Sequence, residues 1–323
     1  MKIIALIVGG FTEEHQISML SAQTILAHID VKKYQIFQVE ILPKVWQVLY
    51  KDQTFLVDKN DFSFLFEGKK IKFDAAYLMI HGIPAEDGCL QGYFKLINLP
   101  FIGPDLLDAA LTLNKNLTNK LLKNLSFNIA NSLFLTKKMT YSLTDIAEQI
   151  GFPCIVKPNN GGSSFGVSKV KKIEDLQNAI DFAFSSFDEI LIEQFITGKE
   201  YSGGVSDFLG EITALPITAI EFEGEFFDFQ AKYEGKSQEI TPAKIPESLT
   251  KRCQETLISI YKNLQLRGTV RIDFILTPDS QMYILEINTI PGMSPASMIP
   301  KQLSVAGISL FDFVNKNLDR LFS

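Results

Sequence analysis

The chain has 323 residues, a formal net charge of −6 and 46% hydrophobic residues. This length predicts two or three packed domains that bury a sizeable core. The net charge is modest and the basic residues are scattered, whereas a nucleic-acid surface needs a dense cationic stripe. We therefore expect no nucleic-acid partner.

The N-terminal apolar run and the cysteines limit the cellular setting. Residues 1–8 are too few to span a membrane and are followed by Gly9-Gly10, so we expect a buried strand and no membrane association. Cys89, Cys154 and Cys253 are far apart and odd in number, which disfavours a disulfide framework and a zinc site. A cytoplasmic location fits best.

The hydrophobic pattern of the first hundred residues predicts an α/β opening. A strand at 3–8 leads through a glycine turn to a helix that carries Ala22, Ile25 and Ile29 at helical spacing. Further strands are predicted at 35–42 and 75–80, followed by a functional loop at 81–92.

The rest of the chain predicts two α+β regions. One helix is expected at 105–123, after the Gly103-Pro104 break. A small lobe follows, with strands at 154–156, 166–170 and 190–195 and a helix at 174–184. The last region has predicted strands at 201–208, 211–220, 269–276 and 282–287, a helix around 249–264 and a long surface loop at 234–246.

The most informative segment is a strand that ends in Lys157 and leads into the glycine- and serine-rich turn 159–166. Free backbone N–H groups and hydroxyls in such a turn are suited to wrapping phosphate oxygens. By itself such a segment is more often a flexible hairpin with a solvated lysine, so other segments must decide.

A second pattern places Asp273, Glu286 and Asn288 on two successive predicted strands. If these strands pair antiparallel, the three side chains can share one face. Carboxylate and amide oxygens are the ligands that Mg²⁺ prefers, although a polar sheet face is the alternative. The turn 289–297 follows directly, and Gly292 allows close approach of its backbone to a reacting oxygen.

Five blocks in this order resemble the D-alanine–D-alanine ligase family of the ATP-grasp superfamily, over nearly the whole chain. They are residues 9–18, 81–88, the lysine hairpin at 152–167, residues 228–233 and residues 271–297. Each block alone is a weak signal, and their ordered coincidence is a strong one.

The resemblance implies a three-domain ATP-grasp fold of mixed α/β and α+β class, in which two lobes sandwich ATP. We expect a Rossmann-like, parallel-sheet substrate domain at 1–103, a central lobe at 104–193 and a C-terminal lobe with the metal and catalytic residues at 194–323. It also implies a homodimer.

The resemblance further implies a reaction. In the family, the carboxylate of a first D-alanine takes the γ-phosphoryl group of ATP, and the amine of a second D-alanine displaces phosphate to give D-alanyl-D-alanine for bacterial peptidoglycan precursors. Catalysis of this kind consists mostly of charge neutralisation and alignment.

Residue roles follow by similarity. ATP contacts are expected from Lys115, Lys157, Ser164, Glu193, Gln194, Phe195, Ile196, Glu200 and Lys232. Mg²⁺ or Mn²⁺ ligands are expected at Asp273, Glu286 and Asn288. Catalytic positioning is expected from Glu14, Ser163, Tyr233, Arg271 and Gly292, and contacts with the second substrate from His81, Ser297 and the Met298 backbone.

Some positions leave questions open. His81 can equally be a hydrogen-bonded structural histidine, and the role of Glu86 in the same loop is not defined. The family usually has glycine where Ala85 stands, and often an acidic residue where Asn114 precedes Lys115. Residues 232–246 correspond to the family's mobile loop, which closes over bound substrates and excludes water.

Three other functions compete with this one. A ligase of the same superfamily that uses another amino acid or a hydroxy acid is the nearest rival, although Tyr233 favours D-alanine over D-lactate as the second substrate. A P-loop kinase is disfavoured because Gln230 stands where the motif before Lys236 requires glycine. A non-catalytic nucleotide sensor would not need Arg271 and Gly292. The ligase interpretation requires Lys157 to lie on the same face of the molecule as Asp273 and Glu286, so that one nucleotide phosphate fits between the lysine turn and the metal ligands.

Overall fold

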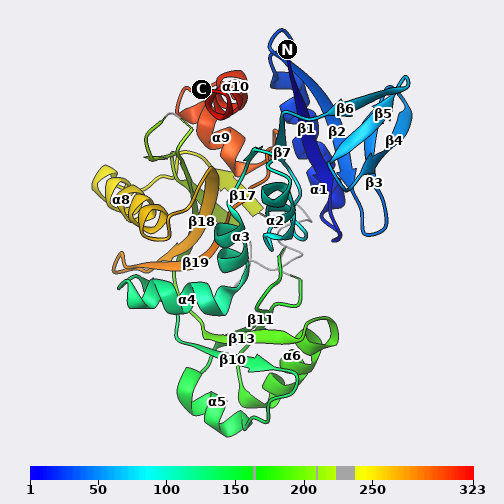
Figure 1. The fold of residues 1–323 in the computed structure, drawn as a ribbon. Helices are drawn as coiled ribbons and strands as arrows, with labels where there is room; N and C mark the ends of the chain where they lie inside the picture. Colours follow the sequence, from blue (N-terminus) through cyan, green and yellow to red (C-terminus); the bar gives the residue numbers. More distant parts are fainter. Residues whose placement is uncertain (163–164, 209, 223–236) are drawn as a thin grey trace.

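The computed structural model spans the chain, and residues 1–162, 165–208, 210–222 and 237–323 are the ones that the structure describes. Within these residues three β-sheets, each covered by helices, form three lobes around a common centre (Figure 1). The predicted mixture of α/β and α+β elements is confirmed. Among the described helices none is both long enough and apolar enough to cross a membrane.

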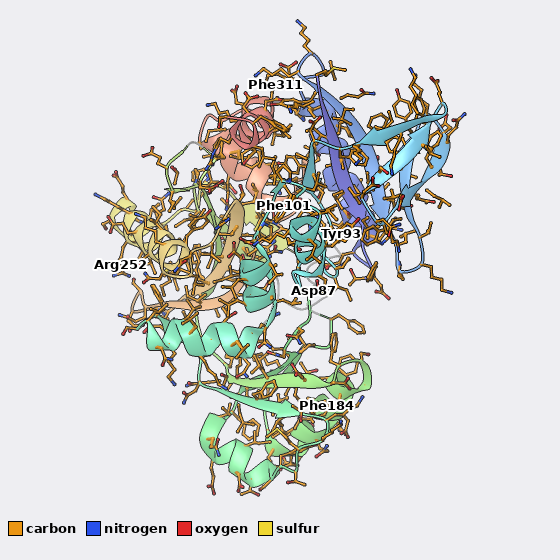
Figure 2. All side chains as sticks on the ribbon, viewed as in Figure 1. Asp87, Tyr93, Phe101, Phe184, Arg252 and Phe311 are labelled. Atoms are coloured by element: carbon orange, nitrogen blue, oxygen red, sulfur yellow. The ribbon has the colours of Figure 1, made fainter. Side chains whose placement is uncertain are left out.

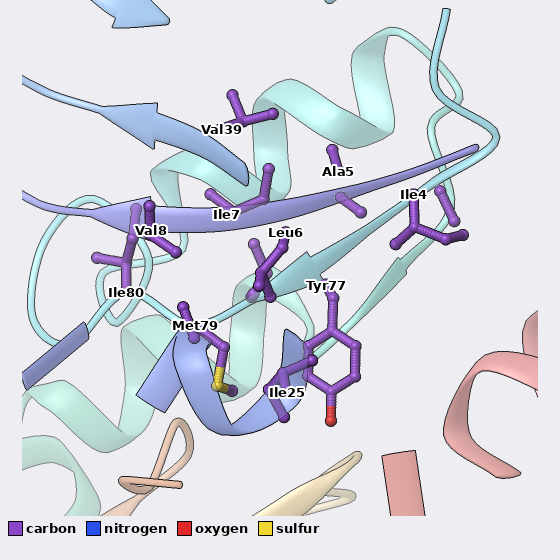
Figure 3. Packing of buried hydrophobic residues seen from close by; sticks show 14 of the residues in the cluster. Ile4, Ala5, Leu6, Ile7, Val8, Ile25, Val39, Tyr77, Met79 and Ile80 are labelled. Atoms are coloured by element: carbon purple, nitrogen blue, oxygen red, sulfur yellow. The ribbon is translucent and has the colours of Figure 1, made fainter. Parts of the chain in front are cut away.

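The first sheet begins as the predicted parallel sheet. β1 pairs in parallel with β2 and β7, and β7 pairs in parallel with β8. The strands are β1 (Lys2–Gly9), β2 (Tyr34–Ile41), β7 (Ala75–Leu78) and β8 (Phe101–Ile102), with helices α1 (His15–His28) and α2 (Cys89–Leu96). Side chains of β1 project to both faces of this sheet (Figure 3), which explains why its sequence is a continuous apolar run.

An antiparallel extension of this sheet was not predicted from the sequence. It consists of β3 (Trp46–Tyr50), β4 (Gln53–Asp58), β5 (Ser63–Phe66) and β6 (Lys69–Lys72). Lys51 and Asp52 connect β3 to β4 with φ of 48° and 61°, a two-residue turn that usually carries asparagine and glycine. Ring contacts such as Phe37 with Phe64, at 5.1 Å between centroids, pack the extension against the parallel strands.

The central lobe has a four-stranded antiparallel sheet. Its order is β10 (Ser132–Thr136), β13 (Glu189–Gln194), β11 (Cys154–Pro158) and β12 (Ser168–Val170). Helices α5 (Leu143–Ile150) and α6 (Ile173–Ser186) pack on it. Figure 2 shows Phe184 of α6 in this lobe and Arg252 on a separate side of the molecule.

The third sheet belongs mostly to the C-terminal part of the chain. Its strands are β17 (Ser237–Ile240), β16 (Thr218–Phe222), β14 (Lys199–Ser206), β18 (Thr269–Leu276), β19 (Met282–Asn288) and β9 (Asn128–Ile129), with β15 (Thr213–Ala214) beside β14. The helices around it are α3 (Leu106–Leu113), α4 (Lys115–Asn124), α8 (Glu247–Asn263) and α9 (Met298–Val305), and α9 is followed by α10 (Leu310–Leu321).

Four predicted elements need correction. The helix at 105–123 is two helices, α3 and α4, because Asn114 between them is extended (φ −84°, ψ 93°) and caps the second. The strand at 211–220 is interrupted, giving β15 and β16, and the loop at 234–246 contains β17, which pairs with β16. The loop at 81–92 ends earlier, since α2 begins at Cys89.

The C-terminal helices pack against the first sheet. Phe313, Val314 and Leu318 of α10 belong to the same buried cluster as β1 and β2. Asn315 accepts a hydrogen bond from the main-chain N–H of Asp30 at 2.8 Å. This packing joins the two ends of the chain; the domain boundaries at 103 and 193 stay a prediction.

Candidate active site

One cavity of about 470 Å³ is lined by strands of the second and third sheets, and by the start of α1 and the loop after β7 from the first lobe. Every predicted site residue that the structure describes lines it. These residues are Glu14, His81, Lys115, Lys157, Glu193, Gln194, Phe195, Ile196, Glu200, Arg271, Asp273, Glu286, Asn288, Gly292, Ser297 and Met298. Four predicted residues, Ser163, Ser164, Lys232 and Tyr233, lie outside the described residues.

Two buried lysines form one side of the cavity. Lys157 on β11 contacts Glu193 at 2.6 Å between Nζ and Oε2. Lys115 donates from Nζ to the Gly161 carbonyl at 2.6 Å and lies 3.7 Å from Oε2 of Glu286. Burial lowers the pKa of Lys115, and Glu286 opposes that effect. Lys115 therefore links the glycine-rich turn to the acidic strand β19.

Asn114 fixes the position of Lys115. Its side-chain oxygen accepts the main-chain N–H of Leu117 at 3.0 Å, which caps α4 and makes Lys115 the first residue of that helix. Asparagine and aspartate cap helices about equally well. The departure from the family's acidic residue is therefore compatible with the same local structure.

Two carboxylates and one guanidinium face the lysines. Asp273 on β18 is directly opposite Glu286 on β19. Arg271 contacts Asp273 at 2.8 Å between Nη2 and Oδ2, and lies 3.6 Å from Oε1 of Glu286. Ser202 donates to Oδ1 of Asp273 at 2.6 Å. Burial lowers the pKa of the Arg271 guanidinium, but the two carboxylates outweigh it and raise that pKa above its ordinary value.

The donor chemistry of these strands fits a magnesium ion. Among the described residues, no cluster of three or more His, Cys, Asp or Glu side chains could hold a metal. Asp273 and Glu286 supply two carboxylates, and Asn288 adds an amide oxygen that also accepts the Ile290 N–H at 2.9 Å. Such an incomplete set suits Mg²⁺, which keeps waters and shares ligands with nucleotide phosphates.

Glu14 lies at the start of α1, between two glycine loops. A Cβ added at Gly82 or at Gly162 would lie 3.5 or 3.4 Å from its Oε2 atom. Both loops thus approach this carboxylate closely. Ala85, in the first of them, is buried without a left-handed φ, so the glycine usual in the family is not required for this backbone.

His81 and Glu86 extend the polar wall of the cavity. Burial lowers the pKa of His81, and Glu14 opposes that effect. Burial, together with repulsion from Glu14, raises the pKa of Glu86 to about 7. Both groups are therefore much closer to neutral than exposed groups of their kinds at the same pH.

The turn after β19 brings Gly292 next to the start of α9. A Cβ added at Gly292 would lie 2.7 Å from Oγ of Ser297, so a larger residue does not fit without a shift. Ser297 is the N-cap position of α9, and its hydroxyl lies 2.8 Å from that of Ser294. The helix N-terminus at Met298 therefore faces the cavity, which suits an anionic group.

Comparisons with known proteins decide the family. Residues 3–104 match the family model described as D-ala D-ala ligase N-terminus, and residues 121–319 match the one described as D-ala D-ala ligase C-terminus. The chain is 44% identical to the D-alanine–D-alanine ligase of Flavobacterium johnsoniae and 42% identical to that of Bacteroides fragilis, each over 320 residues and 99% of both chains. This chain belongs to the D-alanine–D-alanine ligase family.

Solved structures agree with the family's ATP-grasp fold. The VanG D-Ala:D-Ser ligase from Enterococcus faecalis matches with a TM-score of 0.89 at 29% identity, over 99% of each chain. A D-alanine–D-alanine ligase from Bacillus anthracis complexed with ATP matches with a TM-score of 0.80 at 27% identity, over 100% of this chain and 98% of the other. The predicted fold class is thereby confirmed.

The remaining predicted residues of this family member form the far end of the cavity. Gln194, Phe195 and Ile196 follow one another at the end of β13, and Glu200 lies on β14 opposite Ile220. The ammonium of Lys169 lies 3.9 Å from the centroid of the Phe195 ring. This end therefore combines main-chain groups, apolar surface and a carboxylate.

Sequence reasoning missed several contributors. Asn119 donates from Nδ2 to Oε1 of Glu193 at 2.9 Å and holds this carboxylate beside Lys157. Glu239 on β17 lines the cavity and contacts Lys301 at 2.8 Å. Ser21 contacts His81 from α1. Each of these contacts joins residues that are at least 60 positions apart in the sequence, so no local pattern predicts it.

Proposed function

We propose that this chain catalyses the ATP-dependent ligation of two D-alanine molecules to D-alanyl-D-alanine through a D-alanyl phosphate, with formation of ADP. A free carboxylate resists attack by an amine because its carbon is a poor electrophile and oxide is a poor leaving group. Phosphorylation makes the oxygen a leaving group. The product would serve as a peptidoglycan precursor in the bacterial cytoplasm.

The observation that carries this proposal is the shared cavity of Lys157 and the Asp273–Glu286 pair. Phosphoryl transfer depends on cations that surround the migrating group and on ligands that hold a metal against it. Two lysines lie on one wall and two carboxylates on the other, with Arg271 between the carboxylates. A protein that only binds a nucleotide would not require the two carboxylates and Arg271.

ATP binding is assigned to the lysine wall and the far end of the cavity. We assign Lys115 and Lys157 to the phosphates. Phosphate oxygens would then replace the carboxylates of Glu286 and Glu193 as the partners of these two ammonium groups. The adenine and ribose are assigned to residues 193–196 and Glu200, with Ser164 and Lys232 as further phosphate contacts. Apolar walls with a few polar groups are typical of nucleotide pockets.

Magnesium, or manganese in its place, is assigned to Asp273, Glu286 and Asn288. Such an ion neutralises charge on phosphate oxygens and aligns them for transfer. Arg271 holds Asp273 through its guanidinium, and Ser202 holds it through a hydroxyl. These contacts keep the carboxylate oriented when no ion is present.

The first D-alanine is assigned to the region between Glu14 and Arg271. The Glu14 carboxylate would pair with the substrate ammonium, with Ser163 and Tyr233 completing the positioning. Arg271 and the main-chain N–H of Gly292 would stabilise the tetrahedral oxyanion that forms when the amine attacks.

The second D-alanine is assigned to the N-terminus of α9. The Ser297 hydroxyl and the main-chain N–H of Met298 would donate hydrogen bonds to its carboxylate, since the N–H groups and the dipole at a helix N-terminus favour an anion. His81 lines the same cavity. Homodimer formation remains part of the proposal.

A panel of amino acids with ATP and Mg²⁺ tests the proposed substrates. We expect phosphate release only when D-alanine is present, with D-alanyl-D-alanine as the main product by mass spectrometry. D-serine and D-lactate offered with D-alanine distinguish this function from that of a related ligase with another second substrate. ATP binding without product would instead favour a sensor.

A further inference from the structure

Ser21 is a buried serine on α1 that joins three distant segments. The main-chain N–H of Met293 donates to its Oγ at 3.1 Å, and the same Oγ lies 3.2 Å from Nε2 of His81. Ser21 is fully buried and His81 is 5% exposed. An unpaired buried polar group costs about 1–3 kcal/mol, so these contacts hold α1, the 81–88 loop and the 290–293 turn together.

The chemistry of the partners fixes the direction of each hydrogen bond. Nδ1 of His81 lies 2.9 Å from the carbonyl oxygen of Ile290. A carbonyl only accepts, so Nδ1 must carry the hydrogen. In the neutral imidazole, which burial favours, Nε2 then accepts the hydroxyl hydrogen of Ser21.

The result is a closed chain of donors and acceptors around Gly292. It runs from the Met293 N–H to Ser21, from Ser21 to His81, and from His81 to the Ile290 carbonyl. Ile290 and Met293 are both 2% exposed, so apolar packing supports the same turn. Pro291 and Gly292 lie between these two anchors and both line the cavity, and of the two only Gly292 has a main-chain N–H.

We propose that Ser21 and His81 are positioning residues that hold the main-chain N–H of Gly292 toward the reacting oxygen. This inference rests on the proposed function, in which that N–H stabilises the oxyanion. Ser21 is not among the residues that line the cavity, so it acts through the turn and not on the substrate. The hydrogen-bonded ring explains why a serine occupies this position on the buried face of α1.

Fixed donors matter here because a donor stabilises a developing charge only if it is aimed before the charge forms. A misplacement of 1 Å can cost about 100-fold in rate. Loss of the Ser21 hydroxyl removes one of the two polar anchors and lets the Met293 end of the turn move. The residues assigned to ATP lie on other segments, so we expect their contacts to be unchanged.

The test compares Ser21→Ala with Ser18→Ala. Ser18 is a matched control, because it lies one turn earlier on α1, is also fully buried and also makes two hydrogen bonds, from the Gly9 N–H at 3.0 Å and to the Met79 carbonyl at 2.7 Å. Ser18 does not contact the 290–293 turn. Both variants therefore lose a similar amount of stability, and only one loosens Gly292.

We expect Ser21→Ala to lower kcat by about 10- to 100-fold. The KM for ATP should change by less than about twofold, because ground-state binding is untouched. Hydrogen exchange at the Met293 amide should accelerate in Ser21→Ala and stay at the wild-type rate in Ser18→Ala. Equal kcat in the two variants, or unchanged exchange at Met293 in Ser21→Ala, would overturn the inference.

Ser21→Cys keeps the test decisive if the alanine variant does not fold. The thiol fills nearly the same space but is a weaker donor and acceptor. A smaller decrease in kcat with faster exchange at Met293 supports the positioning role, and wild-type values for both contradict it. A wild-type protein that releases no phosphate with D-alanine overturns the proposed function instead, and the exchange rate of Met293 still decides whether Ser21 holds the turn.

Discussion

Asp273 and Glu286 lie directly opposite each other on β18 and β19, and one guanidinium, that of Arg271, lies within 4 Å of both carboxylates. Like charges opposite each other on paired strands repel, so the arrangement depends on a cation between them. Arg271 supplies this cation in the protein alone. A metal ion would add a second.

The metal assignment predicts that Glu286→Gln abolishes turnover and leaves the fold intact. The Glu286 side chain is 39% exposed, so its replacement by an isosteric amide costs little stability. A metal that neutralises phosphoryl charge contributes several kcal/mol, so we expect kcat to fall by at least about 100-fold. Turnover measured across a magnesium titration checks this prediction.

Glu255→Gln is the control for the metal prediction. It removes the same charge from an exposed position on α8, outside the cavity. Its turnover should equal that of the wild type at every magnesium concentration. Near-normal turnover of Glu286→Gln at limiting magnesium would contradict the ligand assignment.

The helix cap at Asn114 predicts a link between local structure and ATP affinity. Asn114→Ala removes the hydrogen bond to the Leu117 N–H, which should cost about 1 kcal/mol of stability. Lys115 is the first residue of the capped helix, so the KM for ATP should also rise. Asn114→Asp preserves the cap and should keep both values near those of the wild type.

Ser142→Ala is the matched control for the cap. Ser142 caps α5 by accepting the main-chain N–H of Asp145 at 3.2 Å, in a helix that does not line the cavity. Its loss should lower stability by a similar amount, with no change in the KM for ATP. An unchanged KM in Asn114→Ala would show that the cap does not position Lys115.

Gln302 predicts a link between α9 and the second substrate. Its fully buried amide accepts the Gly204 N–H and donates to Ser202 O and to Thr218 Oγ1, each at 3.0 Å. Gln302→Leu leaves these buried groups unpaired, which should destabilise the protein by about 2–4 kcal/mol. Because Ser297 and Met298 begin this helix, the KM for the second D-alanine should rise.

Asn317→Leu is the control for the α9 prediction. Asn317 is a buried amide on α10 that donates to Phe313 of its own helix at 2.9 Å. We expect a smaller loss of stability and an unchanged KM. Chemical denaturation measures the loss of stability, and initial-rate kinetics measure the KM. An unaltered KM in Gln302→Leu would show that the position of α9 does not affect binding of the second D-alanine.

Glu86 predicts an unusual dependence of stability on pH. Burial and the nearby Glu14 raise the pKa of Glu86 from 4.5 to about 7. Between these two pH values the folded protein binds more protons than the unfolded chain, so this group's contribution to stability falls as pH rises. Glu86→Gln removes the ionising group and should raise Tm at pH 8 more than at pH 5.

Glu148→Gln is the comparison for this pH effect. Glu148 is an exposed residue on α5, so its replacement should change Tm little at either pH. Thermal unfolding of the three ligand-free proteins at both pH values is sufficient. A Glu86→Gln protein that is no more stable than the wild type at pH 8 would contradict the raised pKa.

Much of the site could be predicted because its residues lie on regular strands. Lys157, Asp273 and Glu286 lie on strands with clear apolar patterns, so their elements were predictable from local sequence. That these residues lie close together in space was expected only from the family resemblance, and the structure places them around one cavity.

The elements that escaped prediction depend on turn geometry or on distant contacts. Lys51-Asp52 forms a tight hairpin without the usual turn residues, so β3 and β4 left no turn signal. Asn114 interrupts an otherwise continuous helical pattern because its side chain caps the next helix. Ser21 bonds with Met293, 272 residues away, and no local pattern reports such a contact.

The most direct measurement counts the products of the wild-type protein with ATP, Mg²⁺ and D-alanine. If one cavity phosphorylates a carboxylate and then joins it to an amine, ADP, phosphate and D-alanyl-D-alanine must form in equal amounts. We predict this equality, with no phosphate release when D-alanine is left out. ATP hydrolysis without dipeptide, or no hydrolysis at all, would contradict the account.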